Sequence, residues 1–223
     1  MSSYFLLSTY DERDNNYITL QDNPDGGGPL IYVRYLDYLC PKCRSFDRAA
    51  LFARKQGLEG GPKIRVSKGR ELAEARDGFL LIKSRVVELL KEHDVGGYET
   101  RAVPYTDWHA LRVTHRVAYR DFTPEWERKA PCTTCGRGAY YGVAQALRHI
   151  AVPIRDNTFF APELERTNAY DVFMTEDVAR MLKSSGVKGG LLIRLLDDEE
   201  FRLFCEGTPA ARRKLKDFRI YLT

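Results

Sequence analysis

The sequence predicts an α+β fold, with a mixed or antiparallel sheet and short helices. Short apolar and β-branched segments alternate with turn residues, which is typical of strands. Two segments have the apolar spacing of an amphipathic helix, and an extended segment follows each of them. Two Cys-x-x-Cys pairs supply four candidate metal ligands. We therefore expect a single α+β domain over residues 1–223 that contains two zinc knuckles.

Length and composition exclude several classes of protein. A chain of 223 residues suits one large domain, and 43% hydrophobic with 12% aromatic residues excludes general disorder. The 35 Lys and Arg residues nearly balance the 31 Asp and Glu residues, for a net charge of +4. This balance excludes an acidic nucleic-acid mimic and does not favour a strongly basic nucleic-acid binder.

No segment predicts a membrane location. The longest apolar runs, at residues 79–82 and 191–193, are far shorter than the roughly 20 residues of a spanning helix. The segment Met1–Leu7 lacks the basic start of a signal peptide. We expect a cytoplasmic protein with no membrane partner, and the sequence does not determine its oligomeric state.

The expected elements follow in order along the chain. The first part contains strands at 4–9, 17–20 and 31–36, a turn at 22–29 and a glycine-rich loop at 57–62. The carboxyl-terminal part contains a helix that opens at 197–200, a short helix from Pro209 and a strand at 218–222.

Two helices are expected between these parts. Ser84–His93 has an apolar face, Ser84 is expected to cap its start, and an extended segment follows at 98–103. A second helix is expected to be capped by Thr175, to end at Gly186 and to lead into an extended segment at 191–195.

The two helical segments align at an offset of 92 residues. The aligned pairs are Val86 with Val178, Leu89 with Met181, Leu90 with Leu182, Lys91 with Lys183, Val95 with Val187, and Gly97 with Gly189. The cysteine pairs have the same offset. One hypothesis is an old duplication with halves 1–110 and 111–223. The alternative is chance combined with common helix-stop chemistry, because residues 44–83 and 136–175 share little identity.

The cysteine pairs predict a zinc site. They are Cys40-Pro41-Lys42-Cys43 and Cys132-Thr133-Thr134-Cys135. Zinc binds four ligands in a tetrahedron, with sulfur at about 2.3 Å, and each pair supplies two thiolates. Gly136 lets the backbone turn after the second pair, whereas Arg44 takes that place after the first. We expect a structural zinc, because four thiolates leave no open position for a reacting water.

Other interpretations of the cysteines stay open. They could be buried thiols, or one pair could be redox-active. However, neither pair is preceded by the tryptophan that precedes a thioredoxin-like pair. Each pair could also bind its own metal with outside ligands. The fifth cysteine, Cys205, is alone.

The remaining polar residues give a weaker signal. The sequence has no G-x-S-x-G elbow, Walker loop or dinucleotide fingerprint, and no His-x-Glu near the cysteines. The histidines are His93, His109, His115 and His149. A catalytic interpretation takes His109 or His115 as the reactive imidazole, with Asp107 or Asp121 as its partner. The alternative is a polar surface or a satisfied interior imidazole.

Three further segments suggest contacts with a partner. Residues 105–126 interleave aromatic and charged side chains, which is typical of an interface and equally of a core. The acidic run 197–200 could meet a basic partner, and the basic run 212–216 could contact phosphates.

The cysteine pairs, the second of which reads Cys132-Thr133-Thr134-Cys135-Gly136, resemble the myxobacterial double-CXXCG motif family. The segment Asp171–Leu182, followed by Gly186-Val187-Lys188-Gly189-Gly190, looks like the carboxyl region of that family. Arg44 departs from the motif, which has glycine there. The resemblance implies a cytoplasmic immunity protein that protects against a toxin delivered by kin, such as a swarming-inhibition toxin.

We therefore expect a non-enzymatic immunity protein that neutralises one cognate protein toxin by occlusion. Cys40, Cys43, Cys132 and Cys135 would hold its halves together around a structural zinc. The alternatives are a nucleic-acid-associated zinc-ribbon protein, which would use residues 212–216, and an enzyme built around His109, His115 and Asp121.

Overall fold

The computed structural model describes the following parts of the chain: residues 3–9, 40–42, 47–53, 69–74, 80–103, 106–117, 132–136, 154–162, 172–196, 199–200, 203, 208–209 and 219–223. The strands expected at 17–20 and 31–36, the turn at 22–29 and the loop at 57–62 lie outside the described residues.

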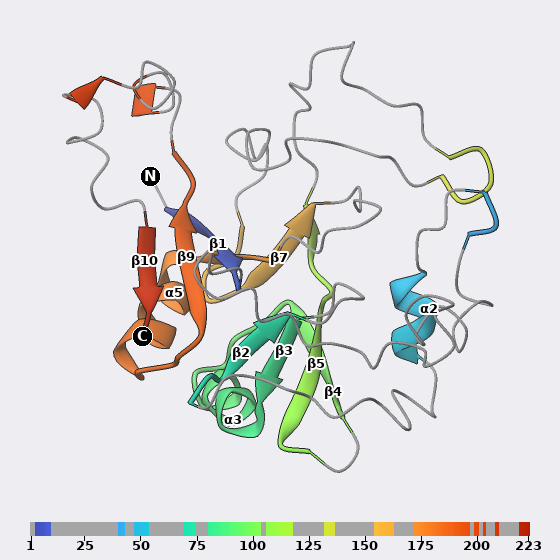
Figure 1. Ribbon diagram of the computed structural model, residues 1–223, viewed down its shortest axis with the longest axis horizontal. Coiled ribbons are helices and arrows are strands. Elements are labelled where there is room, and N and C mark those ends of the chain that lie inside the picture. The colour runs from blue at the N-terminus through green and yellow to red at the C-terminus, as the bar shows by residue number, and fades with distance from the viewer. Residues whose placement is uncertain are drawn as a thin grey trace, which may run out of the picture.

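One sheet has six strands, in the order β10-β9-β1-β8-β7-β6. These strands are β1 (Tyr4–Ser8), β6 (Arg116–Val117), β7 (Phe159–Pro162), β8 (Val172–Thr175), β9 (Gly190–Arg194) and β10 (Arg219–Leu222). Neighbouring strands are antiparallel, except that β6 and β7 are parallel. The amino-terminal strand β1 therefore lies inside a mixed sheet, between β8 and β9 (Figure 1).

The other sheet has four antiparallel strands, in the order β2-β3-β5-β4. They are β2 (Leu72–Glu74), β3 (Leu80–Lys83), β4 (Tyr98–Ala102) and β5 (Trp108–Val113). The predicted class, an α+β fold with mixed and antiparallel sheets and short helices, is thus confirmed for the described residues.

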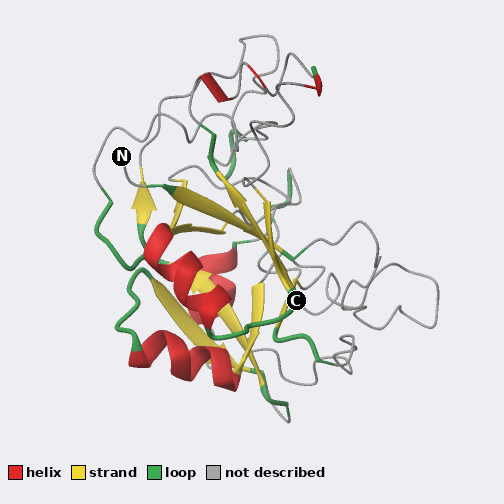
Figure 2. Ribbon diagram, turned by 90° about the vertical axis from the view of Figure 1, so that its left-hand side faces the viewer, coloured by secondary structure: helices red, strands yellow, loops and turns green. Residues whose placement is uncertain are grey.

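The described helices are α2 (Arg48–Ala53), α3 (Ser84–Glu92) and α5 (Glu176–Ser184). Helices α3 and α5 each bury one apolar face, as their sequence spacing predicts, and lie beside the strands (Figure 2). Both helices and one face of each sheet share a single hydrophobic core, which includes Leu90, Leu182, Leu111 and Leu7. None of the described helices is long and apolar enough to cross a membrane.

The helix starts differ from expectation. The prediction that Ser84 caps α3 is wrong: Lys83 is the N-cap, and the Ser84 hydroxyl donates to the carbonyl oxygen of Asp107 at 3.2 Å. Thr175 does occupy the N-cap of α5, but its side chain makes no capping bond. Its Oγ1 accepts the N–H of Thr158 at 3.2 Å. Both helices follow directly on a strand. Each hydroxyl therefore forms a hydrogen bond with a backbone group of a neighbouring segment, and not with the first turn of its own helix.

Candidate metal centre

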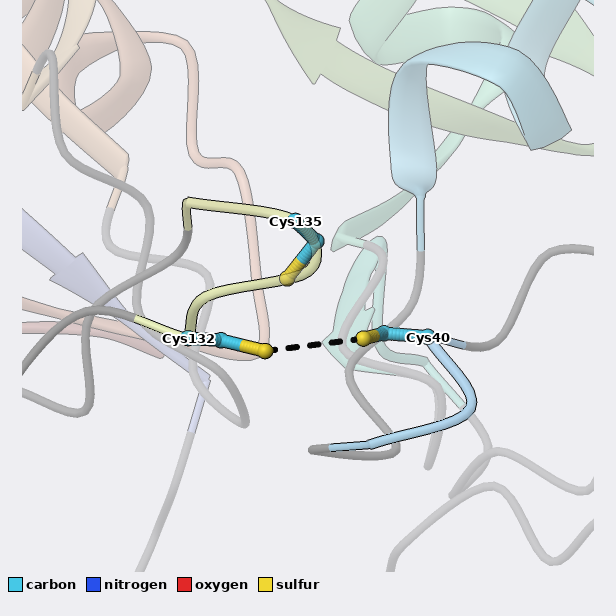
Figure 3. Close-up of side chains that lie close together, drawn as sticks. All are labelled: Cys40, Cys132 and Cys135. Carbon is cyan, nitrogen blue, oxygen red and sulfur yellow. Dashed lines mark hydrogen bonds between the residues drawn. The ribbon is translucent and has the colours of Figure 1, made fainter.

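Three cysteines from two distant parts of the chain lie together. The Sγ atoms of Cys40 and Cys132 are 3.7 Å apart. With Sγ of Cys135, all three sulfur atoms lie within 4.8 Å of one another. Cys40 is buried, and the other two are half-buried. Figure 3 shows the three side chains converging from two chain segments.

The segment from Cys132 to Gly136 is a turn that carries two of these thiols. The N–H of Gly136 donates to the carbonyl oxygen of Cys132 at 2.7 Å. Gly136 has a φ of +70°, in the left-handed region that favours glycine. The prediction that Gly136 turns the backbone after the second pair is confirmed.

A side-chain bond links the two cysteine segments. Nζ of Lys42, inside the first Cys-x-x-Cys pair, donates to Oγ1 of Thr133 at 2.7 Å, inside the second pair. Both side chains are exposed. Exposed polar bonds contribute little free energy, so this bond aligns the segments more than it stabilises them.

The sulfur spacing fits a metal better than a disulfide. A disulfide requires an S–S distance of about 2.05 Å, whereas the Sγ atoms of Cys40 and Cys132 are 3.7 Å apart. Four thiolates at about 2.3 Å from a tetrahedral zinc lie about 3.8 Å from one another. The 3.7 Å between Cys40 and Cys132 is close to that value. Cys40, Cys132 and Cys135 are therefore placed to bind a metal ion, and their soft sulfur donors suit zinc.

The structure thus brings together three of the four predicted ligands. Cys43, the fourth, lies outside the described residues, as does Cys205. The four-cysteine site therefore stays a prediction. The link between Lys42 and Thr133 had no signal in the sequence, because neither residue type is a metal ligand and the two are 91 positions apart.

A second polar cluster lies at the start of α3. Nε2 of His109, on β5, is 3.1 Å from Oγ of Ser84. Nζ of Lys83 is paired with Oδ2 of Asp107 at 2.8 Å and lies 5.4 Å from the centre of the Trp108 ring. The sequence interpretation placed His109 with a carboxylate and missed Ser84, because only strand pairing brings residues 25 positions apart together.

Burial lowers the pKa of His109, and the positive charge of Lys91 lowers it further, against the opposing effect of Asp107. The imidazole is therefore biased toward its neutral form. A neutral imidazole beside a hydroxyl has the composition of a nucleophile and its base. Ser84 has one hydroxyl proton, so His109 can act as that base only when the proton turns from the carbonyl oxygen of Asp107 to Nε2.

Other predicted functional residues are dispersed. His93 and His115 are exposed and away from the cysteine cluster. Trp108 is 5% exposed, so it belongs to the interior and not to an interface. Glu200, from the acidic run, is paired with Arg194 at 2.5 Å. The remaining candidates lie outside the described residues: His149, Asp121 and the basic run 212–216.

No protein-family model matches the chain, and no curated protein matches it. The resemblance to the double-CXXCG family therefore stays a prediction.

Proposed function

We propose that this chain is an immunity protein that binds and neutralises a cognate toxin, and that a zinc ion stabilises the fold that does so. The observation that carries the proposal is the cluster of Cys40, Cys132 and Cys135. It joins the two Cys-x-x-Cys segments on which the resemblance to the immunity family rests.

The metal in this proposal has a structural role. Cys43 would supply the fourth thiolate, and a zinc with four thiolates has no free position for substrate or water. Binding energy at such a site is folding energy, because the ligands are brought together only in the folded chain. The zinc would hold the segments at Cys40 and Cys132 in fixed positions.

Neutralisation would proceed by occlusion. A surface that is rigid before binding loses little conformational entropy on binding, and this favours high affinity for one partner. The fixed cysteine segments provide such rigidity without a catalytic step. The partner in this proposal is a protein, not a nucleic acid or a membrane.

One observation favours a second candidate function. The contact between Ser84 and His109 is compatible with an enzyme that uses Ser84 as nucleophile. Among the described residues, no carboxylate bonds the other ring nitrogen of His109, and Asp121 lies outside them, so this part of the chain shows only two members of a catalytic triad.

The function is tested by capture followed by protection. The tagged chain is purified from native cells, each stoichiometric protein partner is expressed alone, and its toxicity is measured. We expect one partner that kills cells alone and is harmless when the chain is co-expressed. We expect Cys135→Ser to abolish protection and His109→Phe to retain it.

Two results would contradict the proposal. Copurification of nucleic acid without a protein partner would favour the nucleic-acid alternative. Loss of protection in a folded His109→Phe variant would favour the enzyme. Circular dichroism of each variant shows whether its fold is intact.

A further inference from the structure

Three consecutive elements of the chain recur at one offset. Adding 92 to the bounds of β3 (Leu80–Lys83) gives those of β8 (Val172–Thr175). The same addition converts the bounds of α3 into those of α5, and the bounds of β4 into those of β9. The strand-helix-strand segments therefore agree in length and spacing at every boundary.

The strand that lies between the two strands of each segment also has a counterpart. β5 lies between β3 and β4, and β1 lies between β8 and β9. Leu111 of β5 pairs with residues 80 and 100, whereas Leu7 of β1 pairs with residues 172 and 192. Adding 92 to the residue numbers of the two partners of Leu111 gives the two partners of Leu7. The two middle strands thus have the same register on both sides.

A fourth strand completes each set. β2 is antiparallel to β3, with Leu72 opposite Ile82, and β7 is antiparallel to β8, with Phe159 opposite Met174. Since residue 174 is the counterpart of residue 82, Phe159 is the counterpart of Leu72. We call β2, β3, α3, β4 and β5 the α3 unit, and β7, β8, α5, β9 and β1 the α5 unit.

The helix ends match in backbone detail. The N–H of Val95 donates to Leu90 at 2.9 Å, and the N–H of Val187 donates to Leu182 at 3.1 Å. The preceding residues are both left-handed: Asp94 has a φ of +49° and Gly186 a φ of +64°. Gly97 and Gly189 follow with φ values of +77° and +98°. A shared sequence period explains the lengths, but agreement of dihedral angles requires the same backbone path.

The contacts between the units are reciprocal. The N–H of Phe159 donates to the carbonyl oxygen of Gly96 at 3.0 Å. The N–H of Leu72 donates to the carbonyl oxygen of Lys188 at 3.1 Å, and residue 188 is the counterpart of residue 96. Each unit therefore donates one backbone N–H to the other and accepts the equivalent N–H in return. This reciprocity is the signature of a two-fold interface.

The cysteine cluster obeys the same relation. Cys40 and Cys132 are 92 positions apart, and their sulfur atoms are 3.7 Å apart. In a two-fold arrangement, an atom meets its own counterpart only near the axis. The contact between Cys40 and Cys132 therefore places the cluster at the axis.

We infer that the chain is an internal repeat whose units are related by a pseudo-two-fold axis, exchange their first strands, and hold the metal between equivalent cysteines on that axis. The metal part of this inference rests on the proposed function. In chain order, the described elements that the halves share are a strand, a cysteine pair, two strands, a helix and a strand. The first half also contains α2, and the second also contains β6 and β10. The boundary expected between residues 110 and 111 falls inside β5, so the halves divide before Trp108. β1 then opens the first half but lies in the α5 unit, and β5 opens the second half but lies in the α3 unit.

Strand exchange makes each unit incomplete without the other half of the chain. The α3 unit needs β5 at its centre, and the α5 unit needs β1. A metal on the axis adds a third connection, to which each half contributes equally. Equivalent cysteines should then contribute equally to metal affinity.

The experiment compares zinc affinity, by competition with a chromogenic chelator, in the wild-type chain, Cys40→Ser and Cys132→Ser. We expect both variants to lose affinity at least 10-fold, by factors that agree within about 3-fold. Wild-type affinity in either variant would overturn the position of the metal. If a serine variant does not fold, Cys40→His and Cys132→His, which keep a zinc donor, give the same comparison.

A crystal structure of the wild-type chain decides the repeat independently of the metal. One rotation close to 180° should superpose the α3 unit on the α5 unit and carry Cys40 onto Cys132. A rotation far from 180°, or a middle strand drawn from its own half of the chain, would overturn the repeat. If the wild-type chain binds no zinc, the metal centre of the proposed function fails, while the superposition still decides the repeat.

Discussion

The α3 unit and the α5 unit have the same backbone arrangement but differ in most of their polar side chains. Core positions agree: Val86 and Leu90 have the counterparts Val178 and Leu182, and all four are buried. Polar positions agree less, although Lys91 and Lys183 are identical. Ser84 and His109, which contact each other in the α3 unit, correspond to Glu176 and Phe5 in the α5 unit. Packing therefore constrains the apolar face and the turn residues, while the surface of each unit is free to differ.

This difference separates what the fold requires from what a function uses. Features present in both units, such as Gly97 and Gly189, follow from the shared backbone. Features present in one unit, such as the contact of Ser84 with His109, are not needed for the unit to form. Variants at paired positions can test this separation.

The largest effect is expected at the glycines between the units. A Cβ on Gly97 would lie 2.0 Å from the carbonyl oxygen of Phe159, and one on Gly189 would lie 2.8 Å from that of Leu72. Both residues also have positive φ. We expect Gly97→Ala to cost about 3–5 kcal/mol and Gly189→Ala about 2–3 kcal/mol, measured by urea denaturation.

Gly186→Ala is the matched control for these variants. Gly186 has a φ of +64°, but a Cβ there would meet no atom within 4 Å. Only the left-handed backbone is penalised, so we expect a cost of about 1–2 kcal/mol. Gly186→Asp should cost less, because its counterpart Asp94 already adopts this conformation. Equal costs for Gly97→Ala and Gly186→Ala would contradict the close approach of the units.

The smallest effect is expected at His109. Because its pKa is lowered in the folded chain, the unfolded chain binds more protons below about pH 6.5. Stability should therefore fall as the pH drops from the unfolded pKa through the folded one. His109→Phe, which installs the residue found at the counterpart position, should reduce this loss. Melting temperatures at pH 7.5 and 5.5 test this, and an unchanged difference between them would assign the acid sensitivity to other groups.

Local pattern was sufficient to predict much of the fold. The helix expected at Ser84–His93 is α3, Gly186 ends α5, and the strands expected at 4–9 and 218–222 are β1 and β10. These elements follow from apolar spacing and glycine, which act within a few residues. The sheet order did not follow, because the position of β1 between β8 and β9 depends on contacts across the whole chain.

The site was predictable to a similar degree. A zinc site needs several cysteine ligands. Two Cys-x-x-Cys pairs therefore predict that their cysteines lie close together, even though Cys40 and Cys132 are 92 positions apart in the sequence. Hydroxyl groups carry no such requirement. Ser84 could satisfy a helix end or a strand, and only the tertiary structure places it beside Asp107 and His109.

The central claim is that one metal joins the two halves of the chain through four cysteines. Cobalt substitution tests it most directly, because the intensity of the visible absorption and the thiolate charge-transfer bands report the geometry and the number of thiolate ligands. The chains to compare are wild type, Cys43→Ser, Cys135→Ser and, as the matched control, Cys205→Ser. We expect one metal per wild-type chain, in a tetrahedral site with four thiolates. The thiolate charge-transfer bands should weaken equally in Cys43→Ser and Cys135→Ser, and the spectrum of Cys205→Ser should be unchanged. A wild-type spectrum in Cys43→Ser, or two metals per chain, would contradict the claim.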